Sequence, residues 1–263
     1  MKVREITSLI EAFAPLSLQE SYDNSGLIVG RDDDEVHGVL LAVDVTEEVI
    51  AEAVSEGCDM IITHHPIIFH ALKRFNSASQ TERCVEETIR RGIVLYAAHT
   101  NLDSTPQGMS WRVGTMIGLE GMRVLEPQAN NPNVGFGVVG ELAKSEDVIA
   151  FMRRVGKLFD VKAVRHSDIP ESSSEIRRVA ICTGSGHSLI GDALRVGADV
   201  YITGDLKYND FMLGENRMIL MDIGHFESEF CAINILDDVL SKKLCNFAVR
   251  KSVCSRSPIH YLL

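Results

Sequence analysis

The sequence predicts an α/β protein built from two α/β lobes, each with a mostly parallel or mixed sheet. Two observations lead to this prediction. Short apolar runs alternate with segments of helical periodicity along most of the 263 residues, which favours β-α-β units with right-handed crossovers. A stretch rich in Pro, Asn and Gly at residues 125–137 interrupts the alternation, so we place a boundary between the lobes there.

The first lobe opens with an amphipathic helix, because apolar residues recur at helical spacing between Ile6 and Phe13. The continuous apolar run at residues 38–45 is typical of a parallel strand that is buried on both faces. A helix follows it, since Thr46 suits the N-terminal cap of a helix and Gly57 suits its end.

Two further strands complete the first lobe. Residues 59–63 form the next apolar run, and a charged helix over about 80–91 ends at Gly92. Residues 93–99 then form the third strand. Each of these two strands leads directly into a polar motif, HHP after the first and HTNLD after the second.

The second lobe repeats the alternation with different elements. We expect a helix near 146–157, a strand over 158–164 and a polar loop at 166–175. Two or three strand-loop units follow, in residues 177–187, 198–205 and 217–225, with a helix reaching about residue 196 after the first of them. The strand-like segments 247–253 and 259–263 are expected to return to the first sheet. The predicted domains are therefore 1–125 with 226–263, and 126–225.

Composition narrows the class of protein. A content of 45% hydrophobic and 24% charged residues is that of an ordinary globular protein. The formal charge of −11 argues against a nucleic-acid partner, but not against a nucleotide substrate, because bound cations invert the charge of a site. The six cysteines form no CxxC pair and are expected to be reduced. With no signal-peptide pattern and no apolar stretch of membrane-spanning length, we expect a cytoplasmic protein without a membrane partner.

Five side chains are candidate metal ligands. They share one placement, directly after a short apolar run, and they are His64, His65, Asp103, His225 and Glu229. In an open α/β sheet the carboxyl ends of the strands form the crevice where ligands bind. Five donors are too many for one tetrahedral zinc, and they suit two divalent metals that share a bridging carboxylate and a water. Zn, Fe, Mn, Ni and Mg all remain open as the metal.

Each motif also has a plainer interpretation. Pro66 disfavours helix at His65, which supports a turn that can direct both histidines of HHP to one place. The histidines can equally be loop residues that bond to the backbone. Asp103 can be a helix cap, and His99 can orient a ligand by hydrogen bonding.

GHFESE is the strongest single motif. We expect a helix to begin around Phe226, after a tight turn at Gly224. His225 and Glu229 are four residues apart, so both can face the same side of its first turn. Glu227 lies two residues from each and is expected to point into solvent.

Two glycine-bearing turns are weaker signals. CTGSGHS, residues 182–188, can cradle a phosphate, although a plain tight turn is the favoured interpretation. TGDLKYND, residues 203–210, places Asp205, Lys207 and Tyr208 at a strand end, either as substrate contacts or as solvated charges. The roles of Asp205, Lys207 and His99 stay open at this point.

Taken in order, the motifs YDNSGLIVG, ITHHPIIF, HTNLD, ADVYITGDLKYND and GHFESE resemble the GTP cyclohydrolase I type 2 family, the Nif-three-like dinuclear-metal proteins. The resemblance implies two lobes, a two-metal site between them, a homohexamer, and metal ligands at the five positions already listed. The sequence departs from the family at Tyr22, where Trp is frequent, and at Asn209, where a second His is common.

The function that this resemblance implies is a metal-dependent hydrolase, with opening of the purine ring of GTP towards a dihydroneopterin product as its reaction. Two alternatives stay open. One is a phosphoesterase or amidohydrolase that uses the same five ligands on another small molecule. The other is a non-catalytic, metal-binding regulatory hexamer. No residue is identified as the general base.

Overall fold

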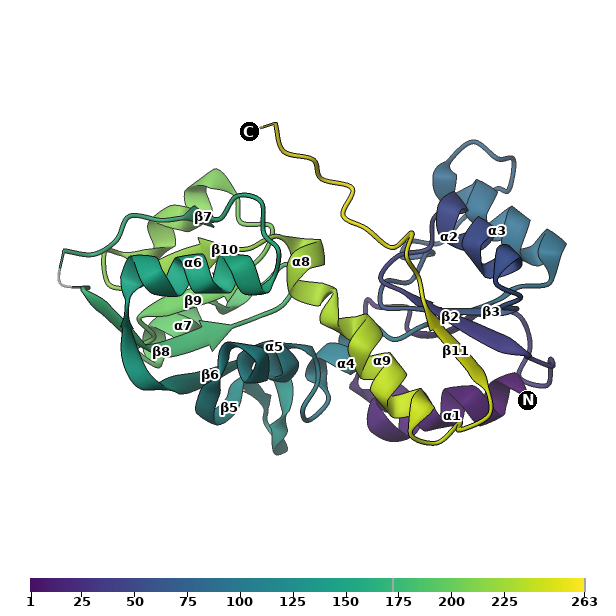
Figure 1. Ribbon diagram of the computed structural model, residues 1–263, viewed down its shortest axis with the longest axis horizontal. Helices are drawn as coiled ribbons and strands as arrows, with labels where there is room; N and C mark the ends of the chain where they lie inside the picture. The colour runs from purple at the N-terminus through teal and green to yellow at the C-terminus, as the bar shows by residue number, and fades with distance from the viewer. Residues whose placement is uncertain (172, 263) are drawn as a thin grey trace. The chain divides into compact units, whose positions relative to one another are not determined.

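Figure 1 shows the computed structural model of the protein, which describes residues 1–171 and 173–262. The chain divides into two compact units. The first comprises Met1–Thr105 with Ala232–Arg256, and the second comprises Pro106–Cys231 with residues 257–262. Each unit contains one sheet with helices packed on it, so the protein has the predicted mixed α/β fold.

Five strands form the sheet of the first unit, in the order β1-β4-β3-β2-β11. They are β1 (Gly26–Val29), β2 (Gly38–Ala42), β3 (Met60–Thr63), β4 (Val94–Ala97) and β11 (Ala248–Lys251). Four of them run parallel, and β1 runs antiparallel to β4. The three strands predicted in the first lobe are confirmed with shorter bounds, and the segment 247–253 joins this sheet as predicted, through β11.

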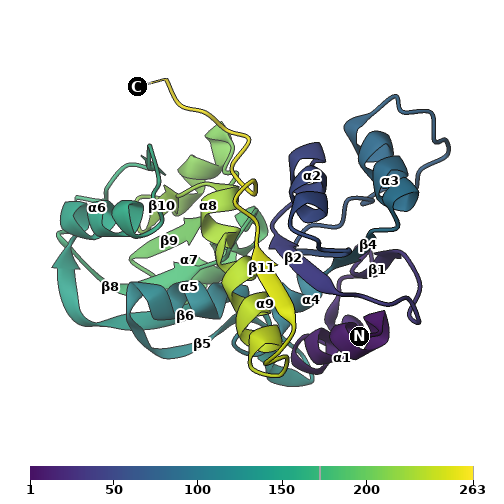
Figure 2. The same ribbon diagram turned by 45° about the vertical axis from the view of Figure 1, so that its right-hand side comes forward.

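Helices cover both faces of this sheet. They are α1 (Val3–Phe13), α2 (Glu47–Ser55), α3 (Gln80–Arg91), α4 (Thr100–Ser104) and α9 (Cys231–Ser241), with the 3₁₀ turn η1 at Leu16–Leu18. Figures 1 and 2 place α2 and α3 on one face and α1 and α9 on the other. Leu40 and Ala42 of β2 pack in the cluster beneath α2 and α3. Val39 and Leu41 are equally buried and point to the opposite face, because successive side chains of a strand alternate.

The predicted helix caps in this unit are confirmed. The Thr46 hydroxyl accepts a hydrogen bond from Val49 N at 3.2 Å and so satisfies a free amide at the start of α2. Gly92 ends α3 in the left-handed region, at φ 67°. These two residues fix where the chain turns back into the sheet.

Glu52 of α2 ties down the segment that follows β11. Its carboxylate accepts hydrogen bonds from Ser252 Oγ at 2.5 Å, Val253 N at 2.8 Å and Cys254 N at 3.1 Å. Burial opposes ionisation of this carboxyl, but the hydrogen bonds from Ser252, Val253 and Cys254 outweigh it and lower its pKa.

We expect Glu52→Ala to lower the free energy of unfolding at pH 7 by about 1–2 kcal/mol. Because the pKa of Glu52 is lower in the folded chain, its stabilising effect is present above the unfolded pKa of about 4.3 and is lost as the pH falls through the folded value. Urea unfolding at pH 7 and in acid measures both effects. Ser252→Ala should cost less in the Glu52→Ala background than in wild type, and equal costs would show that the two residues are not coupled.

Six strands form the sheet of the second unit, in the order β5-β6-β8-β9-β10-β7. They are β5 (Leu119–Gln128), β6 (Asn131–Asp147), β7 (Arg165–His166), β8 (Glu175–Ile181), β9 (Val200–Thr203) and β10 (Ile219–Asp222). β8, β9 and β10 are parallel, and the other neighbours pair antiparallel. The sheet is therefore mixed, and its three parallel strands are the predicted strand-loop units.

The helices of the second unit are α5 (Met109–Ile117), α6 (Val148–Leu158), α7 (Ile190–Arg195) and α8 (His225–Glu229), with 3₁₀ turns η2 (His187–Leu189) and η3 (Tyr208–Gly214). Ile190 and Ala193 of α7 pack in one cluster with Ala180 of β8 and Tyr201 of β9. The residues described include no helix that is both long and apolar enough to cross a membrane.

The segment 125–137 is not the boundary loop that its composition predicts. It lies inside the long hairpin of β5 and β6, which turns at residues 129–130. Pro127 is tolerated because β5 is an edge strand. Gly135 is required because a Cβ there would lie 2.0 Å from Glu126 O. Since α5 packs on this hairpin, the second unit begins at Pro106, in place of the expected boundary at 125.

Two other predicted strands are wrong. Residues 159–164 are described and form no strand, because α6 extends to Leu158 and Asp160 then turns the chain in the left-handed region at φ 49°. In 259–263 the described residues 259–262 are irregular, and residue 263 lies outside the described residues. The predicted loop 166–175 contains no helix or strand over 167–171 and 173–174, and residue 172 lies outside the described residues.

Candidate metal centre

Three histidines gather at the carboxyl ends of β3 and β4 in the first unit. His64 and His65 follow Thr63, the last residue of β3, in a bend before Pro66, as the proline predicts. His99 follows β4. One ring nitrogen from each of the three histidines lies within 4.8 Å of the others, and the side chain of His64 is completely buried.

Each of these rings donates its Nδ1 hydrogen to an oxygen atom. The pairs are His64 with Ala98 O at 2.8 Å, His65 with Asp44 Oδ1 at 2.8 Å, and His99 with Asp23 Oδ1 at 2.7 Å. A carbonyl or carboxylate oxygen can only accept, so the neutral ring carries its hydrogen on Nδ1 and its lone pair on Nε2. This is the arrangement of metal-binding histidines, whose second nitrogen is held by an acceptor.

Asp103 lies beside these histidines. Its Oδ1 is 3.9 Å from His64 Nε2, and its side chain is 15% exposed. Asp103 is inside the short helix α4, whereas the N-cap of α5 is Gly108. The alternative that Asp103 caps the following helix is therefore wrong.

Asp23 anchors the third histidine. It accepts hydrogen bonds from His99 Nδ1, Thr100 N and Ser25 Oγ, and from Thr100 Oγ1. Burial opposes ionisation of this carboxyl, but the hydrogen bonds from His99 and Thr100 outweigh it and set its pKa well below the usual range. Asp23 therefore remains ionised and fixes the orientation of the His99 ring.

The second unit carries its own histidine and carboxylate pair, on α8. His225 Nε2 lies 2.9 Å from Glu229 Oε2, and His225 Nδ1 lies 2.7 Å from Asp205 Oδ2. The helix begins at His225, one residue before the expected start, and the four-residue spacing brings the two side chains together. Asp205, whose role the sequence left open, thus holds His225 as Asp44 holds His65.

Asp222 fixes the two loops that carry Asp205 and His225. Its buried carboxylate accepts hydrogen bonds from Leu206 N and Gly224 N, both at 2.9 Å, and it pairs with Arg165. Leu206 follows Asp205 and Gly224 precedes His225, so one carboxylate sets the start of both loops. Asp222 is not among the site residues that the sequence predicts.

The turn at 182–188 is a tight turn, and it packs against Glu229. Gly184 has φ 65°, and its N–H donates to Ser228 Oγ at 2.9 Å. A Cβ at position 184 would lie 2.1 Å from Glu229 Oε1. The glycine is therefore required both for its backbone conformation and for the space that the Glu229 carboxylate occupies.

We expect Gly184→Ala to displace the Glu229 carboxylate and to lower the free energy of unfolding by about 1–3 kcal/mol, through strain in the left-handed region and the clash. Thermal unfolding measures the loss. Gly197→Ala is the matched control, because Gly197 has a similar φ of 66° and the nearest neighbour of its added Cβ lies 3.7 Å away. Equal losses in the two variants would show that contact with Glu229 contributes nothing.

Glu227 does not point freely into solvent as expected. It is half-buried, and its carboxylate folds back over Gly224 at the start of α8, so that a Cβ on Gly224 would lie 2.2 Å from Glu227 Oε2. A carboxylate at this end of a helix is favoured by the free N–H groups there. Lys207 and Tyr208 are exposed.

The chemistry of the donors fits divalent metal ions. His225 Nε2 and Glu229 Oε2 are 2.9 Å apart, which is close enough for both to bind one ion at about 2.0–2.2 Å from each. Imidazole nitrogens with carboxylate oxygens suit zinc, iron, nickel and manganese. Each unit therefore presents a group of side chains that could hold a metal.

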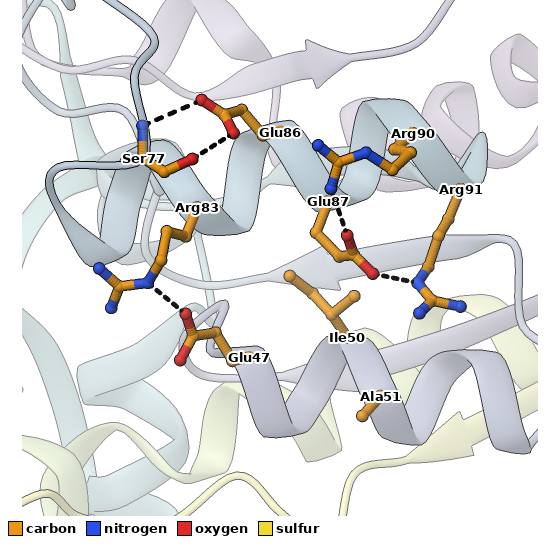
Figure 3. Close-up of a pocket in the computed structure, with 9 residues that line it drawn as sticks. All are labelled: Glu47, Ile50, Ala51, Ser77, Arg83, Glu86, Glu87, Arg90 and Arg91. Carbon is orange, nitrogen blue, oxygen red and sulfur yellow. Dashed lines mark hydrogen bonds and ion pairs between the residues drawn. The ribbon is translucent and has the colours of Figure 1, made fainter.

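A separate hollow of about 360 Å³ lies between α2 and α3 in the first unit (Figure 3). Its charged side chains pair with one another, as Arg83 does with Glu47, and Arg90 and Arg91 do with Glu87. This hollow contains none of the candidate ligands, and its internal ion pairs leave little charge to attract a ligand.

The fold and these clusters define a two-unit α/β protein with a candidate metal-binding group in each unit. The model of the Duf34/NIF3 (NGG1p interacting factor 3) family matches residues 1–258, and the chain belongs to this family.

Curated relatives and solved structures agree with this assignment. A "GTP cyclohydrolase 1 type 2 homolog" of Clostridium perfringens is 34% identical and covers 93% of both chains. A protein with the same description from Streptococcus pneumoniae is 32% identical over the whole of both chains. The crystal structure of a hypothetical protein from Staphylococcus aureus is 28% identical and has a TM-score of 0.91, covering 100% of this chain and 99% of that one.

Proposed function

We propose that the two histidine and carboxylate groups, one in each unit, bind two divalent metal ions together in a hydrolase-like centre. The ligands are His64, His65, Asp103, His225 and Glu229. The observation that supports this most strongly is common to His64, His65 and His225, whose Nδ1 atoms are all held by an oxygen acceptor. Metal-binding histidines commonly have their second ring nitrogen held in this way. His37 and His166 make the same kind of bond away from the cluster, so the bond supports a metal only together with the grouping of His64 and His65 and the pairing of His225 with Glu229.

Two ions follow from the number of donors. Three nitrogens and two carboxylates cannot fill two coordination shells unless one carboxylate bridges and water completes the rest. Glu229 is our candidate for the bridge, because it is the more buried of the two carboxylates, with 5% of its side chain exposed against 15% for Asp103. Asp44 and Asp205 orient the rings of His65 and His225.

The chemistry that divalent ions would supply, if these residues hold them, is a bound water that ionises near neutral pH and polarisation of the bond to be cleaved. The chain's own contribution is to hold the ligand atoms in place. Asp222 and Gly184 do so in the second unit, and Asp23 and Asp44 do so in the first.

For the substrate we propose GTP, whose purine ring would be opened towards a dihydroneopterin product. The description of the curated relatives supports this choice. The test is to incubate purified, metal-loaded protein with GTP, with other nucleotides and with generic phosphoesters, alongside elemental analysis. Metal-dependent product from GTP is expected. Product from phosphoesters alone would replace GTP by a phosphoesterase substrate, and no turnover of any substrate would favour a non-catalytic metal-binding protein.

We also propose that the protein assembles as a homohexamer in the cytoplasm. The motif resemblance described above implies this assembly, and the apolar side chains that η3 exposes support it, with Tyr208 80% and Met212 62% accessible. Light scattering should give about six times the subunit mass of 29.0 kDa. A stable monomer would contradict this assembly.

A further inference from the structure

Two large aromatic side chains are exposed beside the histidines of the first unit. Tyr22 is 63% exposed and Phe69 is 41% exposed. Their ring centroids lie 6.3 Å apart with the planes inclined by 60°. They come from different loops, before β1 and after β3, and the fold brings them side by side. Leaving these two large apolar rings exposed to water is unfavourable.

The aromatic pair lies next to the histidine cluster of the candidate metal centre. Phe69 contacts His99 with 6.1 Å between centroids, and His99 lies 5.2 Å from His64 and 5.4 Å from His65. Exposure falls along this series from Tyr22 to His64, which is fully buried. A flat molecule resting on Tyr22 or Phe69 would therefore lie next to the candidate ligands.

The two aromatic residues are held in place by their neighbours. Asn24 Nδ2 donates to Ile68 O at 2.7 Å and ties the loop of Tyr22 to the loop of Phe69. Asp23, next to Tyr22, is bonded to Thr100 N at 3.1 Å. Rigid aromatic residues lose little conformational freedom on binding, which favours recognition of a ligand.

The protein's own charge around this pair is negative, so the two rings do not recognise a phosphate by themselves. Besides burial, the carboxylates of Glu20, Asp23 and Asp103 raise the pKa of the Tyr22 hydroxyl, so all three act at this position. Without a bound metal ion, these carboxylates would repel an anionic group at the rings. A neutral ring is favoured, since stacking on an aromatic face needs no positive charge.

We propose that Tyr22 and Phe69 form a stacking site for a flat nitrogen heterocycle, which they hold beside the histidine cluster. The claim that this ring belongs to a substrate rests on the proposed function. The stacking site itself rests only on the arrangement of the two aromatic side chains in the first unit. In this proposal Tyr22 and Phe69 determine the specificity for a ligand with a flat ring.

The test is isothermal titration calorimetry of the full chain, as purified and after removal of metal by chelation. Guanosine and cytidine are the flat probes, and ribose 5-phosphate is the probe without a ring. In the metal-free protein we expect the flat probes to bind and ribose 5-phosphate not to bind. Tyr22→Leu and Phe69→Leu should each weaken binding of the flat probes by about 5- to 100-fold, whereas Tyr22→Phe should retain it. Phe75→Leu is the control, because Phe75 is 54% exposed in the same unit but lies outside the series of rings.

Two outcomes would overturn the stacking site. One is that wild type binds neither flat probe, and the other is that Tyr22→Leu and Phe69→Leu bind them as wild type does. Metal content, measured on the same preparations by elemental analysis, reports on the proposed centre separately. Protein that binds guanosine through Tyr22 but holds no metal would support the stacking site and contradict the dinuclear centre.

Discussion

Glu229→Ala is expected to remove most of the bound metal from the protein and to leave its fold in place. In the proposed centre Glu229 would contribute to the binding of both ions, so its loss would weaken both, whereas loss of another ligand would weaken one. The side chain lies at the end of α8 against Gly184. Removing it therefore leaves a small gap beside a tight turn and does not disturb either sheet.

Glu227→Ala is the matched control for this prediction. Glu227 is on the same helix, but its carboxylate folds back over Gly224. We expect wild type and Glu227→Ala to retain about two ions per subunit after dialysis, and Glu229→Ala to retain fewer than one. Elemental analysis gives the metal content, and circular dichroism gives the fold. Equal loss of metal in both variants would contradict the bridging role.

The second large effect is expected at Asp222. Asp222→Ala leaves the buried N–H group of Leu206 and the partly buried N–H group of Gly224 without their acceptor, and it also removes the ion pair of Arg165, which keeps its hydrogen bond to Leu206 O. Each unsatisfied group costs about 1–3 kcal/mol. We therefore expect the free energy of unfolding to fall by about 2–4 kcal/mol.

Arg165→Ala separates the two causes of this loss. Its side chain is 55% exposed, whereas that of Asp222 is 4% exposed, and an ion pair with an exposed partner contributes little. The arginine variant should thus lose less than half as much stability in chemical denaturation. If Arg165→Ala costs as much as Asp222→Ala, the ion pair and not the backbone acceptor holds the two loops.

The elements predicted best are those whose local signals agree with their packing. The strands β2, β3 and β4 are apolar runs buried on both faces, and Thr46 and Gly92 mark helix ends through their own chemistry. The lobe boundary predicted at residues 125–137 was wrong because Pro127 and Gly135 are typical of loops. In the folded chain Pro127 is tolerated because β5 is an edge strand, and Gly135 is required because two backbones approach closely. Neither condition can be read from the local sequence.

In the candidate site too, features with a local sequence signal were predicted, and contacts between distant residues were not. Placement after an apolar run identified the histidines, and helical spacing predicted that His225 and Glu229 lie together. The carboxylates that hold the rings were harder to find, because their partners are far away in the sequence. Asp23 bonds His99 and Asp44 bonds His65, across 76 and 21 residues. Asp44 and Asp222 also end apolar runs, and that shared placement was the signal that could have revealed them.

The central claim is that both units contribute ligands to one pair of metal ions. The most direct test is anomalous diffraction from crystals of the wild-type protein, with data collected above and below the absorption edge of its metal. We expect two anomalous peaks about 3.5–4 Å apart, bound by His64, His65 and Asp103 from the first unit and by His225 and Glu229 from the second. A single peak, no peak, or peaks bound by residues of one unit alone would contradict the claim.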